Sequence, residues 1–311
     1  MRQGAPPLRI GTRGSPLALV QAKDVRDRLL MRFPDLAGRG VAIEVIKTTG
    51  DQIQDRNLSE IGGKGLFTKE IEEALLDGRI DLAVHSMKDM PTVLPPGLIL
   101  SAVLPREDAR DVLVSSEAAT LETLPHGTVV GTSSLRRRAQ LLYRRSDLRI
   151  VDFRGNVDTR LEKLRSGVAA ATILARAGLN RLGRSDVTGV SLAPEDFLPA
   201  VAQGIVTIES RESDDEINPL VTALGDPITQ KCADAERALL LVLDGSCRTP
   251  IAGYATYETE VLWLRGSVVA PDGSQAFVGE RHGAPNDAAA MGADLGRELL
   301  ALGGNVLDAL R

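Results

Sequence analysis

Short apolar runs alternate with amphipathic stretches along the first two-thirds of the chain, a pattern typical of βα units on a largely parallel sheet. In the first part of the chain, strands are predicted at Leu8–Thr12, Val41–Thr48, Ile80–His85 and Leu98–Leu104. One helix is predicted to start at Ser15 and to continue to Phe33, with apolar residues at helical spacing. A second helix is predicted over Thr68–Asp77 and ends at Gly78.

The same alternation restarts after Pro105 and predicts a second α/β unit of similar build. Its strands are predicted at Asp111–Ser115, Thr128–Gly131, Arg149–Phe153 and Ala169–Leu174. Its helices are predicted at Ser134–Arg145 and Asn156–Arg165, the second capped by Asn156 and closed by Gly167. A late strand at Gly204–Ser210 follows this unit, and its position favours a return of the chain to the first sheet.

The tail changes character at Asp226-Pro227 and predicts a small α+β domain. A helix that carries Cys232 on its apolar face precedes three strands, at Ile251–Tyr257, Val261–Val269 and Gln275–Glu280, and a closing helix runs from a cap at Asn286 to Leu302. Cys232 and Trp263 are predicted to be core residues. The domain division expected from these patterns is 1–104 with a return segment 204–222, then 109–198, then 226–311.

Composition excludes several classes of protein. Of the 311 residues, 43% are hydrophobic and 25% are charged, which is the balance of a globular protein. No run of 18 apolar residues and no apolar signal segment occur, so no membrane span is expected and the expected location is the cytoplasm. The two cysteines form no CxxC pair and the three histidines no HExxH motif, so no metal site is expected.

The net charge of −5 conceals a basic segment. The segment between Gly131 and Arg165 contains ten Lys/Arg and only four Asp/Glu. Nine of the ten basic residues are arginines, whose planar guanidinium groups bind carboxylates and phosphates in a bidentate manner. The segment therefore predicts an anionic ligand. The alternative is a basic surface held by Asp147, Asp152 and Asp158.

Two strand ends in this pattern carry candidate chemistry. Asp89 follows the Ile80–His85 strand, where open α/β sheets place their ligand crevice, so it is a candidate acid, base or cation stabiliser; the alternative is a loop acid that caps a turn. The Thr132–Ser134 segment opens a helix and offers backbone N–H groups and the helix dipole to an anion. Because successive helical residues diverge by about 100°, Arg138 and its two preceding arginines cannot all face one cleft.

Other candidates carry weaker signals. Arg154 and Arg160 flank a second strand-to-helix junction suited to an anion. The glycine-rich loop around Lys64 could hold a phosphate, although it is no Walker motif. Cys247 stands beside Arg248 and is either a reactive thiol or an inert loop residue. His85 is expected to be a packed, hydrogen-bonded histidine.

Seven short segments spread over nearly the whole chain carry a resemblance to a known family. They are Ile10–Leu19, Gly62–Phe67, Ala83–Asp89, Gly131–Arg137, Asp152–Asn156 with Thr159-Arg160, Ala177–Leu182 and Gly245–Pro250. In this order and spacing they resemble the porphobilinogen deaminases, also called hydroxymethylbilane synthases. No single segment would suffice, but together they make the match specific.

The resemblance implies an α/β fold of two domains like type II periplasmic-binding proteins, with a cleft between them, plus a small α+β C-terminal domain. It implies a transferase that deaminates and polymerises four porphobilinogen molecules into hydroxymethylbilane, in tetrapyrrole and heme biosynthesis. It also implies a dipyrromethane cofactor, built from substrate-derived pyrroles and held by a thioether to Cys247. The only partner expected is this small-molecule substrate, and a monomer is expected.

The resemblance also assigns roles to individual residues. Asp89 is the implied catalytic carboxylate. The implied cofactor-binding residues, besides Cys247, are Lys88, Ser134, Arg136, Arg137 and Arg160, and the implied substrate-binding residues are Arg13, Ser15, Gln21, Lys64, Arg154 and Arg181.

Residue chemistry is consistent with these roles. Loss of ammonia from an aminomethylpyrrole leaves a cationic azafulvene, which a carboxylate near the pyrrole N–H can stabilise. Each pyrrole ring also carries an acetate and a propionate, so a growing chain needs many fixed cationic donors.

The chain departs from the family pattern at a few positions. Ala202–Thr207 carries bulkier groups where the family usually has glycine or alanine, and this concerns the hinge between domains. Glu60 and Val20 stand where a lysine and an aromatic residue are common, and these concern the lid.

Two other function classes remain at this stage. A non-catalytic solute-binding protein would present the same arginine-lined cleft, although the missing signal segment argues against it. Nucleic-acid binding by the basic segment is disfavoured by the acidic net charge and by an aromatic content of 3%.

Overall fold

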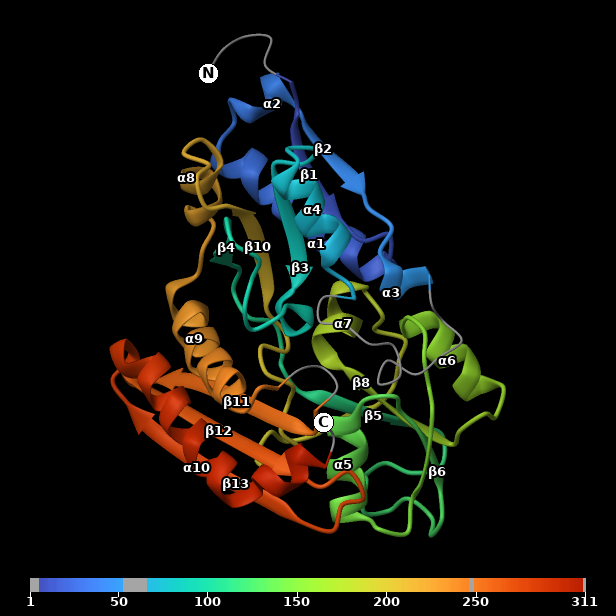
Figure 1. Cartoon of the computed structure of the whole chain (residues 1–311). Coiled ribbons are helices and arrows are strands. Elements are labelled where there is room, and N and C mark those ends of the chain that lie inside the picture. The colour runs from blue at the N-terminus through green and yellow to red at the C-terminus, as the bar shows by residue number, and fades with distance from the viewer. Residues whose placement is uncertain (1–5, 53–65, 246–248, 310–311) are drawn as a thin grey trace. The chain divides into compact units, whose positions relative to one another are not determined.

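The structure is a computed structural model that describes residues 6–52, 66–245 and 249–309 (Figure 1). These residues fall into two compact units, each described by itself below. The first contains the described residues up to Glu107 together with Ile205–Gln230. The second contains Asp108–Gly204 together with the described residues from Lys231 onward.

The first unit is built on a five-stranded sheet in the order β2-β1-β3-β10-β4. Its strands are β1 (Leu8–Thr12), β2 (Val41–Val45), β3 (Leu82–Ser86), β4 (Leu98–Val103) and β10 (Val206–Arg211). β1 runs parallel to β2 and β3, whereas β10 is antiparallel to both β3 and β4. The chain thus returns to the first sheet through β10, between two strands that precede it by more than a hundred positions.

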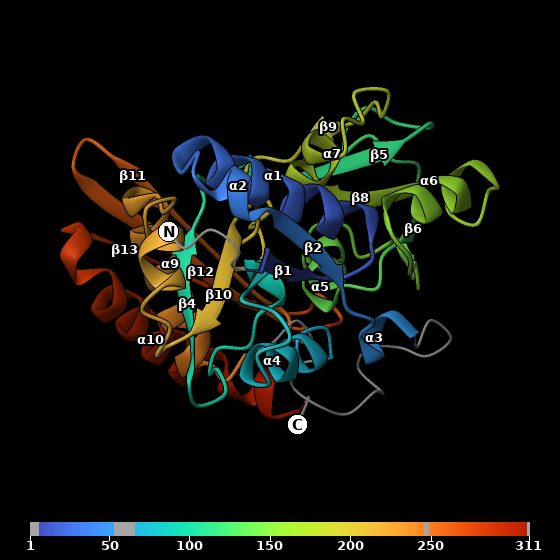
Figure 2. The same cartoon turned by 90° about the horizontal axis from the view of Figure 1, so that it is seen from above.

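Helices cover both faces of this sheet, with α1 and α4 on opposite sides (Figure 2). The helices of the unit are α1 (Pro16–Arg32), α2 (Leu36–Arg39), α3 (Thr49–Gln52), α4 (Lys69–Leu76) and α8 (Ile217–Thr222), and a 3₁₀ turn, η1 (Met87–Asp89), follows β3. Ser15 caps α1 by accepting a hydrogen bond from Ala18 N–H, as predicted. Val84 packs with the α1 face, and its strand neighbour Ala83 packs with the α4 face, because side chains alternate along a strand.

The second unit contains a sheet of the same design, in the order β7-β6-β8-β5-β9. Its strands are β5 (Asp111–Ser115), β6 (Val129–Gly131), β7 (Arg149–Val151), β8 (Ala171–Ala175) and β9 (Val190–Ser191). Its helices are α5 (Leu135–Arg144), α6 (Val157–Arg165) and α7 (Arg176–Arg181). β6 is parallel to β7 and β8, and β5 is antiparallel to β8 and β9.

Both sheets therefore place one strand between two parallel neighbours, followed by an antiparallel strand and an edge strand. This shared order confirms the fold class expected from the resemblance, two α/β domains of the type II periplasmic-binding-protein kind.

The remainder of the second unit is an antiparallel meander, β11 (Ile251–Glu258), β12 (Val261–Val269) and β13 (Ala276–Gly283). The helices α9 (Pro227–Val242) and α10 (Ala288–Asp308) lie beside this sheet in Figure 1, and their apolar residues form one core with it. Cys232 belongs to that core and is 5% exposed, so the prediction of a core cysteine is confirmed. A 3₁₀ turn, η2 (Pro285–Asp287), precedes α10.

Two predictions for this region are wrong. Trp263 is 46% exposed, because it points away from α9 and α10 while its strand neighbours Leu262 and Leu264 point into the core; its ring stacks on His282 at 4.8 Å. Asn286 does not cap the last helix, because it lies within η2, and α10 runs on to Asp308 since its apolar face continues through Val306 and Leu307.

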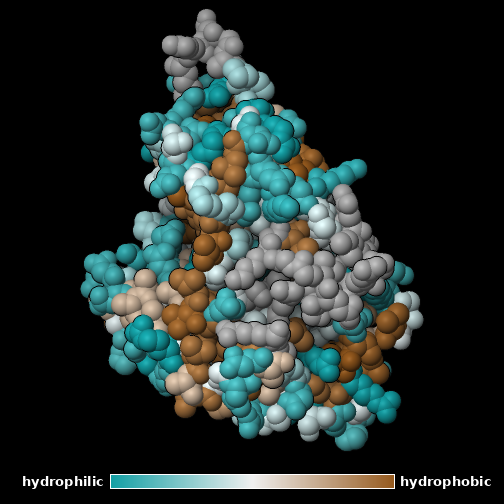
Figure 3. Space-filling view, in the orientation of Figure 1, coloured by the Kyte–Doolittle hydropathy of each residue, from teal (hydrophilic) through white to brown (hydrophobic). Residues whose placement is uncertain are grey.

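None of the helices within the described ranges combines the length and the apolar character needed to cross a bilayer. In Figure 3, hydrophilic residues cover most of the surface seen around α2 and α4.

Ala202, in the segment that leads into β10, adopts a left-handed backbone with φ of +59°. Its N–H donates a hydrogen bond of 2.6 Å to Glu236 Oε2, which helps to hold that conformation. A left-handed backbone destabilises the folded state by about 1–2 kcal/mol for a residue with a Cβ atom. Glycine avoids this strain, but the greater conformational entropy that it gives the unfolded chain lowers stability by about 0.4–1 kcal/mol. We therefore expect Ala202→Gly to raise the free energy of unfolding by up to about 1 kcal/mol in urea titrations.

The same exchange at Ala139 provides the matched control. Ala139 lies inside α5 in ordinary helical backbone, so Ala139→Gly should lower the free energy of unfolding by about 1 kcal/mol. Equal losses in the two variants would show that the backbone of Ala202 is not strained.

Candidate active site

A pocket opens at the edge of the first sheet where β1 and β3 end. Because these strands are parallel, their carboxyl ends meet at one edge, which is where open α/β sheets bind ligands. The lining residues come from the start of α1, from the segment before α4, and from the end of β3 with η1. They are Arg13, Ser15, Leu17, Ala18, Gln21, Phe67, Thr68, Val84, His85, Ser86 and Asp89.

Asp89 enters this pocket as the last residue of η1. Two backbone hydrogen bonds hold the turn: Met87 N–H donates to Ile205 O at 2.9 Å, and Met90 N–H donates to Met87 O at 3.1 Å. The position of Asp89 therefore depends on the pairing of β3 with the segment that enters β10.

Three further predicted site residues line the same pocket. Gln21 is buried and donates to Ser86 Oγ at 2.9 Å, which fixes its amide. Ser15 has its hydroxyl engaged in the α1 cap. Arg13 lies 4.2 Å above the Phe67 ring and forms an ion pair with Asp51 on α3, so its guanidinium has a protein partner in this structure. Neither Phe67 nor Asp51 was predicted as part of the site.

The Arg13 pair affects the protonation of Asp51. Burial alone would raise the pKa of the Asp51 carboxyl, but hydrogen bonds from Arg13 and Thr48 together with the Arg13 charge lower it below its usual value. A ligand carboxylate that binds Arg13 must therefore compete with an ionised Asp51.

His85 contributes to the pocket wall but is itself part of the sheet. Its Nε2 lies 3.1 Å from Glu209 Oε2, and the two side chains are 3% and 0% exposed. The prediction of a packed, hydrogen-bonded histidine is confirmed. Glu209 was not predicted as its partner, because the expected return of the Gly204–Ser210 strand to this sheet does not reveal which of its side chains lies beside His85.

In the second unit, Asp111 at the start of β5 binds two adjacent arginines of α5. Arg136 Nη2 and Arg137 Nη2 lie 2.7 Å and 2.8 Å from its carboxylate oxygens, and all three side chains are buried. Burial alone would raise the pKa of Asp111, but the charges and hydrogen bonds of both arginines hold it well below its usual range. Gln203 Nε2 adds a hydrogen bond of 2.8 Å.

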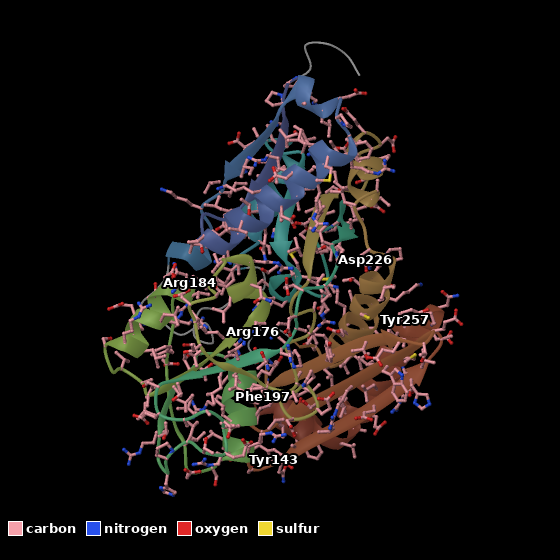
Figure 4. The ribbon with its side chains drawn as sticks, turned by 180° about the vertical axis from the view of Figure 1, so that it is seen from behind. Tyr143, Arg176, Arg184, Phe197, Asp226 and Tyr257 are labelled. Atoms are coloured by element: carbon pink, nitrogen blue, oxygen red, sulfur yellow. The ribbon has the colours of Figure 1, made fainter. Side chains whose placement is uncertain are left out.

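Both guanidinium groups also donate to backbone carbonyls. Arg136 Nη1 lies 2.6 Å from Leu198 O, and Arg137 Nη1 lies 3.0 Å from Ile173 O. Figure 4 shows Phe197 beside α5, and its ring is 5.9 Å from the Arg136 guanidinium. The two arginines thus join α5 to β5, to β8 and to the 197–198 segment.

A second cationic group lies around the start of α6. Arg160 Nε donates to Gly155 O at 2.9 Å, Lys163 Nζ donates to Arg154 O at 3.0 Å, and Arg154 Nη1 is buried without a hydrogen-bond partner among the described residues. Burial, followed by the positive charges of Arg137 and Arg154, lowers the pKa of Arg160 to about 10. Within the described part of the chain neither Arg154 nor Arg160 has a carboxylate partner. An anionic ligand bound there would offset the cost of burying their positive charges.

The helix α5 adds to this environment at its N-terminus. Ser134 is its N-cap and accepts a hydrogen bond from Arg137 N–H at 3.4 Å. The free backbone N–H groups and the helix dipole favour negative charge there.

The remaining arginines of the basic segment are mostly surface residues. Arg138 is exposed, as expected from helical geometry, and Arg145 pairs with Asp147, as the alternative interpretation predicts. Asp158 instead pairs with Arg184, which Figure 4 labels, and so does Asp186. The segment therefore contains three kinds of arginine: the buried pair Arg136 and Arg137 on Asp111, arginines at the surface, and the group around Arg154 and Arg160.

The other predicted site residues are placed as follows. Arg181, at the end of α7, donates to Gly204 O at 2.7 Å, and Lys88 precedes Asp89 in η1. Lys64 and Cys247 lie outside the described residues.

Comparisons with known proteins identify related sequences over nearly the whole chain. The family model "Porphobilinogen deaminase, dipyromethane cofactor binding domain" matches residues 8–219, and "Porphobilinogen deaminase, C-terminal domain" matches residues 230–301. A porphobilinogen deaminase of Paracoccus denitrificans is 56% identical over 94% of this chain and 93% of its own length. The chloroplastic porphobilinogen deaminase of Pisum sativum is 51% identical over 96% of this chain and 82% of its own length.

Among solved structures, a periplasmic substrate-binding protein of an ABC transporter from Coxiella burnetii has a TM-score of 0.42 at 16% identity, covering 74% of this chain and 96% of that chain. A similarity with so low a TM-score and identity carries no conclusion about this chain.

Proposed function

Because this chain belongs to the porphobilinogen deaminase family, we propose that Asp89 is the carboxylate at which its reaction takes place and that Cys247 holds its cofactor. The chain is a hydroxymethylbilane synthase, a transferase of tetrapyrrole biosynthesis. It releases ammonia from porphobilinogen and joins four such molecules into hydroxymethylbilane on a dipyrromethane primer.

The observation that carries the role of Asp89 is its place in the pocket at the carboxyl ends of β1 and β3. When ammonia leaves porphobilinogen, positive charge develops on the substrate and is shared with its ring N–H. A fixed carboxylate beside that N–H stabilises the charge more in the transition state than in the ground state. The same carboxylate can accept a proton from the pyrrole.

Substrate binding is proposed for groups around this carboxylate. Arg13 would exchange Asp51 for a ring carboxylate, while Gln21 and Ser15 supply neutral hydrogen bonds. The full proposed substrate-binding set is Arg13, Ser15, Gln21, Lys64, Arg154 and Arg181.

The second unit supplies donors that fit a cofactor with several carboxylates. Two observations support anion binding here: Arg154 Nη1 is buried and has no hydrogen-bond partner among the residues that the structure describes, and burial lowers the pKa of Arg160. The proposed cofactor-binding residues are Ser134, Arg136, Arg137 and Arg160 of this unit and Lys88 of the first unit, with a thioether from Cys247. When bound, the dipyrromethane supplies a covalent starting point for chain growth.

The intact mass of the purified protein tests this assignment. We expect a mass above that of the sequence by one covalently held dipyrromethane, and we expect Cys247→Ala to lack that addition. Cys232→Ala is the matched control, because that thiol is buried in the core and should leave the addition in place. An addition that survives Cys247→Ala would remove Cys247 from the proposal.

The proposal extends to organisation and location. We assign residues 1–104 with 204–222, 109–198 and 226–311 to three domains, in line with the three sheets. A cytoplasmic monomer without a nucleic-acid partner is in keeping with the acidic net charge of −5 and a small-molecule substrate. Sedimentation velocity tests the monomer, and a dimer at micromolar concentration would contradict it.

A further inference from the structure

Behind the pocket that contains Asp89, three titratable side chains are buried together. His85 of β3 contacts Glu209 of β10 at 3.1 Å, and Glu72 of α4 lies close enough to both for their charges to affect its protonation. Glu72 is 7% exposed and Glu209 is 0% exposed. We call His85, Glu209 and Glu72 the buried triad.

The buried triad has more acceptor capacity than the fold uses. Glu72 Oε1 and Glu209 Oε1 are both buried without a hydrogen-bond partner among the described residues. Burial raises the pKa of Glu72, and the negative charge of Glu209 raises it further. Two carboxylates and one imidazole would carry two negative charges if fully deprotonated, and such a charge is costly in a buried site without a cation.

Proton uptake relieves this cost. With one added proton on the imidazole, His85 and Glu209 form an ion pair, and with a second on Glu72 the triad is neutral. The triad can therefore exist with no, one or two added protons, and because its members lie close together these protonation states belong to the group as a whole.

His85 connects the triad to the pocket. It lines the same pocket as Asp89, and four positions separate the two residues along β3 and η1. Its Nε2 faces Glu209, which leaves Nδ1 as the ring nitrogen that can exchange a proton with the pocket, directly or through one water.

We propose that the buried triad is the proton-holding site of this enzyme, with His85 taking up through the pocket the proton that each condensation releases. The proposal rests on the proposed role of Asp89. The substrate enters each condensation as its ammonium form. The bond from the aminomethyl carbon to nitrogen breaks with its electron pair going to nitrogen, so neutral ammonia leaves; a carbon–carbon bond joins two pyrrole units, and a ring C–H bond breaks. The electron pair of that C–H bond restores the aromatic ring, and its proton is left over.

That proton passes to the Asp89 carboxylate and then to His85 Nδ1. The resulting imidazolium is stabilised by Glu209, which can itself accept the Nε2 proton, and by Glu72 when ionised. Before the next condensation the proton returns through the pocket to solvent. Each cycle thus leaves Asp89 ionised and able to stabilise the next positive charge.

Other charged groups on the surrounding elements are already paired or exposed. They are Glu73, exposed on α4; Glu70, bound to Thr49; Asp81, which lies within salt-bridge distance of Arg9 and Arg211; Asp214, paired with Arg211; and Arg13, paired with Asp51 in the pocket. None of these pairs supplies a cation to the triad.

Variants of α4 test the proposal with a matched pair. Glu72→Gln removes the charge but keeps the size, and we expect it to move the acidic limb of the pH–kcat profile to lower pH by about half a unit or more, because His85 loses a neighbouring negative charge. The melting temperature at pH 8 should be unchanged or higher, since a buried carboxylate has been removed. Glu73→Gln removes the same charge from the exposed face of the same helix. The Glu73 charge has the weakest of the effects that act on the pKa of Glu72, so this variant should move the profile much less than Glu72→Gln does.

His85 itself gives a second variant. His85→Gln keeps an N–H donor for Glu209 but cannot take up a proton, so we expect kcat to fall by about 10- to 100-fold with KM changed by less than about twofold. If kcat/KM falls by the same factor because KM rises, while kcat stays unchanged, the proposal is contradicted.

A measurement on the unmutated protein makes the test independent of how the variants fold. The chain has only three histidines, so ¹⁵N-histidine NMR spectra can follow His85 against His126 and His282. We expect the His85 ring to gain a proton as the pH falls, and to do so at a lower pH in Glu72→Gln. A His85 ring that does not titrate, or a pH profile unmoved by Glu72→Gln while Asp89→Asn is inactive, overturns this inference alone. Full activity of Asp89→Asn overturns the proposed function instead.

Discussion

Replacement of Asp89 by asparagine should lower the rate of ammonia release from porphobilinogen by about 10³-fold or more. The amide keeps the size of the side chain but carries no charge, so it neither stabilises the positive charge on the substrate nor accepts a proton. The expected loss combines one electrostatic contribution of about 10²–10³ with a contribution from proton transfer of about 10²–10⁴, which overlap because one group makes both.

The fold of this variant should be intact, because η1 is held by backbone hydrogen bonds of Met87 and Met90 rather than by the Asp89 side chain. Circular dichroism and the melting temperature check this. Asp35→Asn, at an exposed position of the same unit whose side chain makes no capping bond, serves as the control and should keep full activity. An Asp89→Asn variant with more than about a tenth of the activity would exclude a charged role for this residue.

The largest expected effect on stability is that of Asp111→Ala, which should lower the free energy of unfolding of the second unit by about 3–5 kcal/mol. The substitution leaves the guanidinium groups of Arg136 and Arg137 buried without their carboxylate, and an uncompensated buried charge is far more costly than a lost surface pair. Urea unfolding at pH 7 measures the loss. Glu162→Ala breaks an exposed pair with Arg165 and should cost less than about 1 kcal/mol.

The same carboxylate predicts a pH dependence. Because the pKa of Asp111 is lower in the folded protein than in the unfolded chain, its contribution to stability is fully present above the unfolded pKa of about 4 and is lost as the pH falls toward the folded pKa. The difference in unfolding free energy between the unmutated chain and Asp111→Ala should therefore shrink below about pH 4. A difference that stays constant down to pH 3 would show that folding does not lower the pKa of Asp111.

Local sequence cues predicted most elements of the fold. Apolar alternation located the strands, and the caps at Ser15 and Asn156 are present as hydrogen bonds to Ala18 N–H and Thr159 N–H. Short elements such as α2, α8 and β9 were not predicted, because two to six residues carry too little periodicity.

Contacts between distant segments could not be predicted in the same way. The pairing of Asp111 with the α5 arginines spans 25 positions, and the pairing of Glu209 with His85 spans 124. Trp263 shows the same limit, because a strand with apolar residues on both faces does not reveal which face the helices will cover. The side of a sheet is decided by packing rather than by local sequence.

For the candidate site, position in the fold was the useful cue. Asp89, Arg13 and Gln21 come from separate segments, yet all follow or flank the carboxyl ends of parallel strands, and the structure gathers them in one pocket. Two protein partners of Arg13 were not predicted. Asp51 lies in a stretch without a distinctive motif, and Phe67 ends the Gly62–Phe67 segment, whose sequence does not show that its ring packs against a guanidinium.

The place of β10 between β3 and β4 also bears on how the chain matures during translation. A nascent chain leaves the ribosome from its N-terminus, so β1 to β4 emerge well before Val206–Arg211. All strands of the second α/β sheet have been synthesised once Ser191 has emerged. The first sheet still lacks β10 at that point, so the edges of β3 and β4 that pair with β10 are exposed. The N-terminal unit is thus begun first but completed after the middle of the chain, and until then chaperones have two open strand edges to shield.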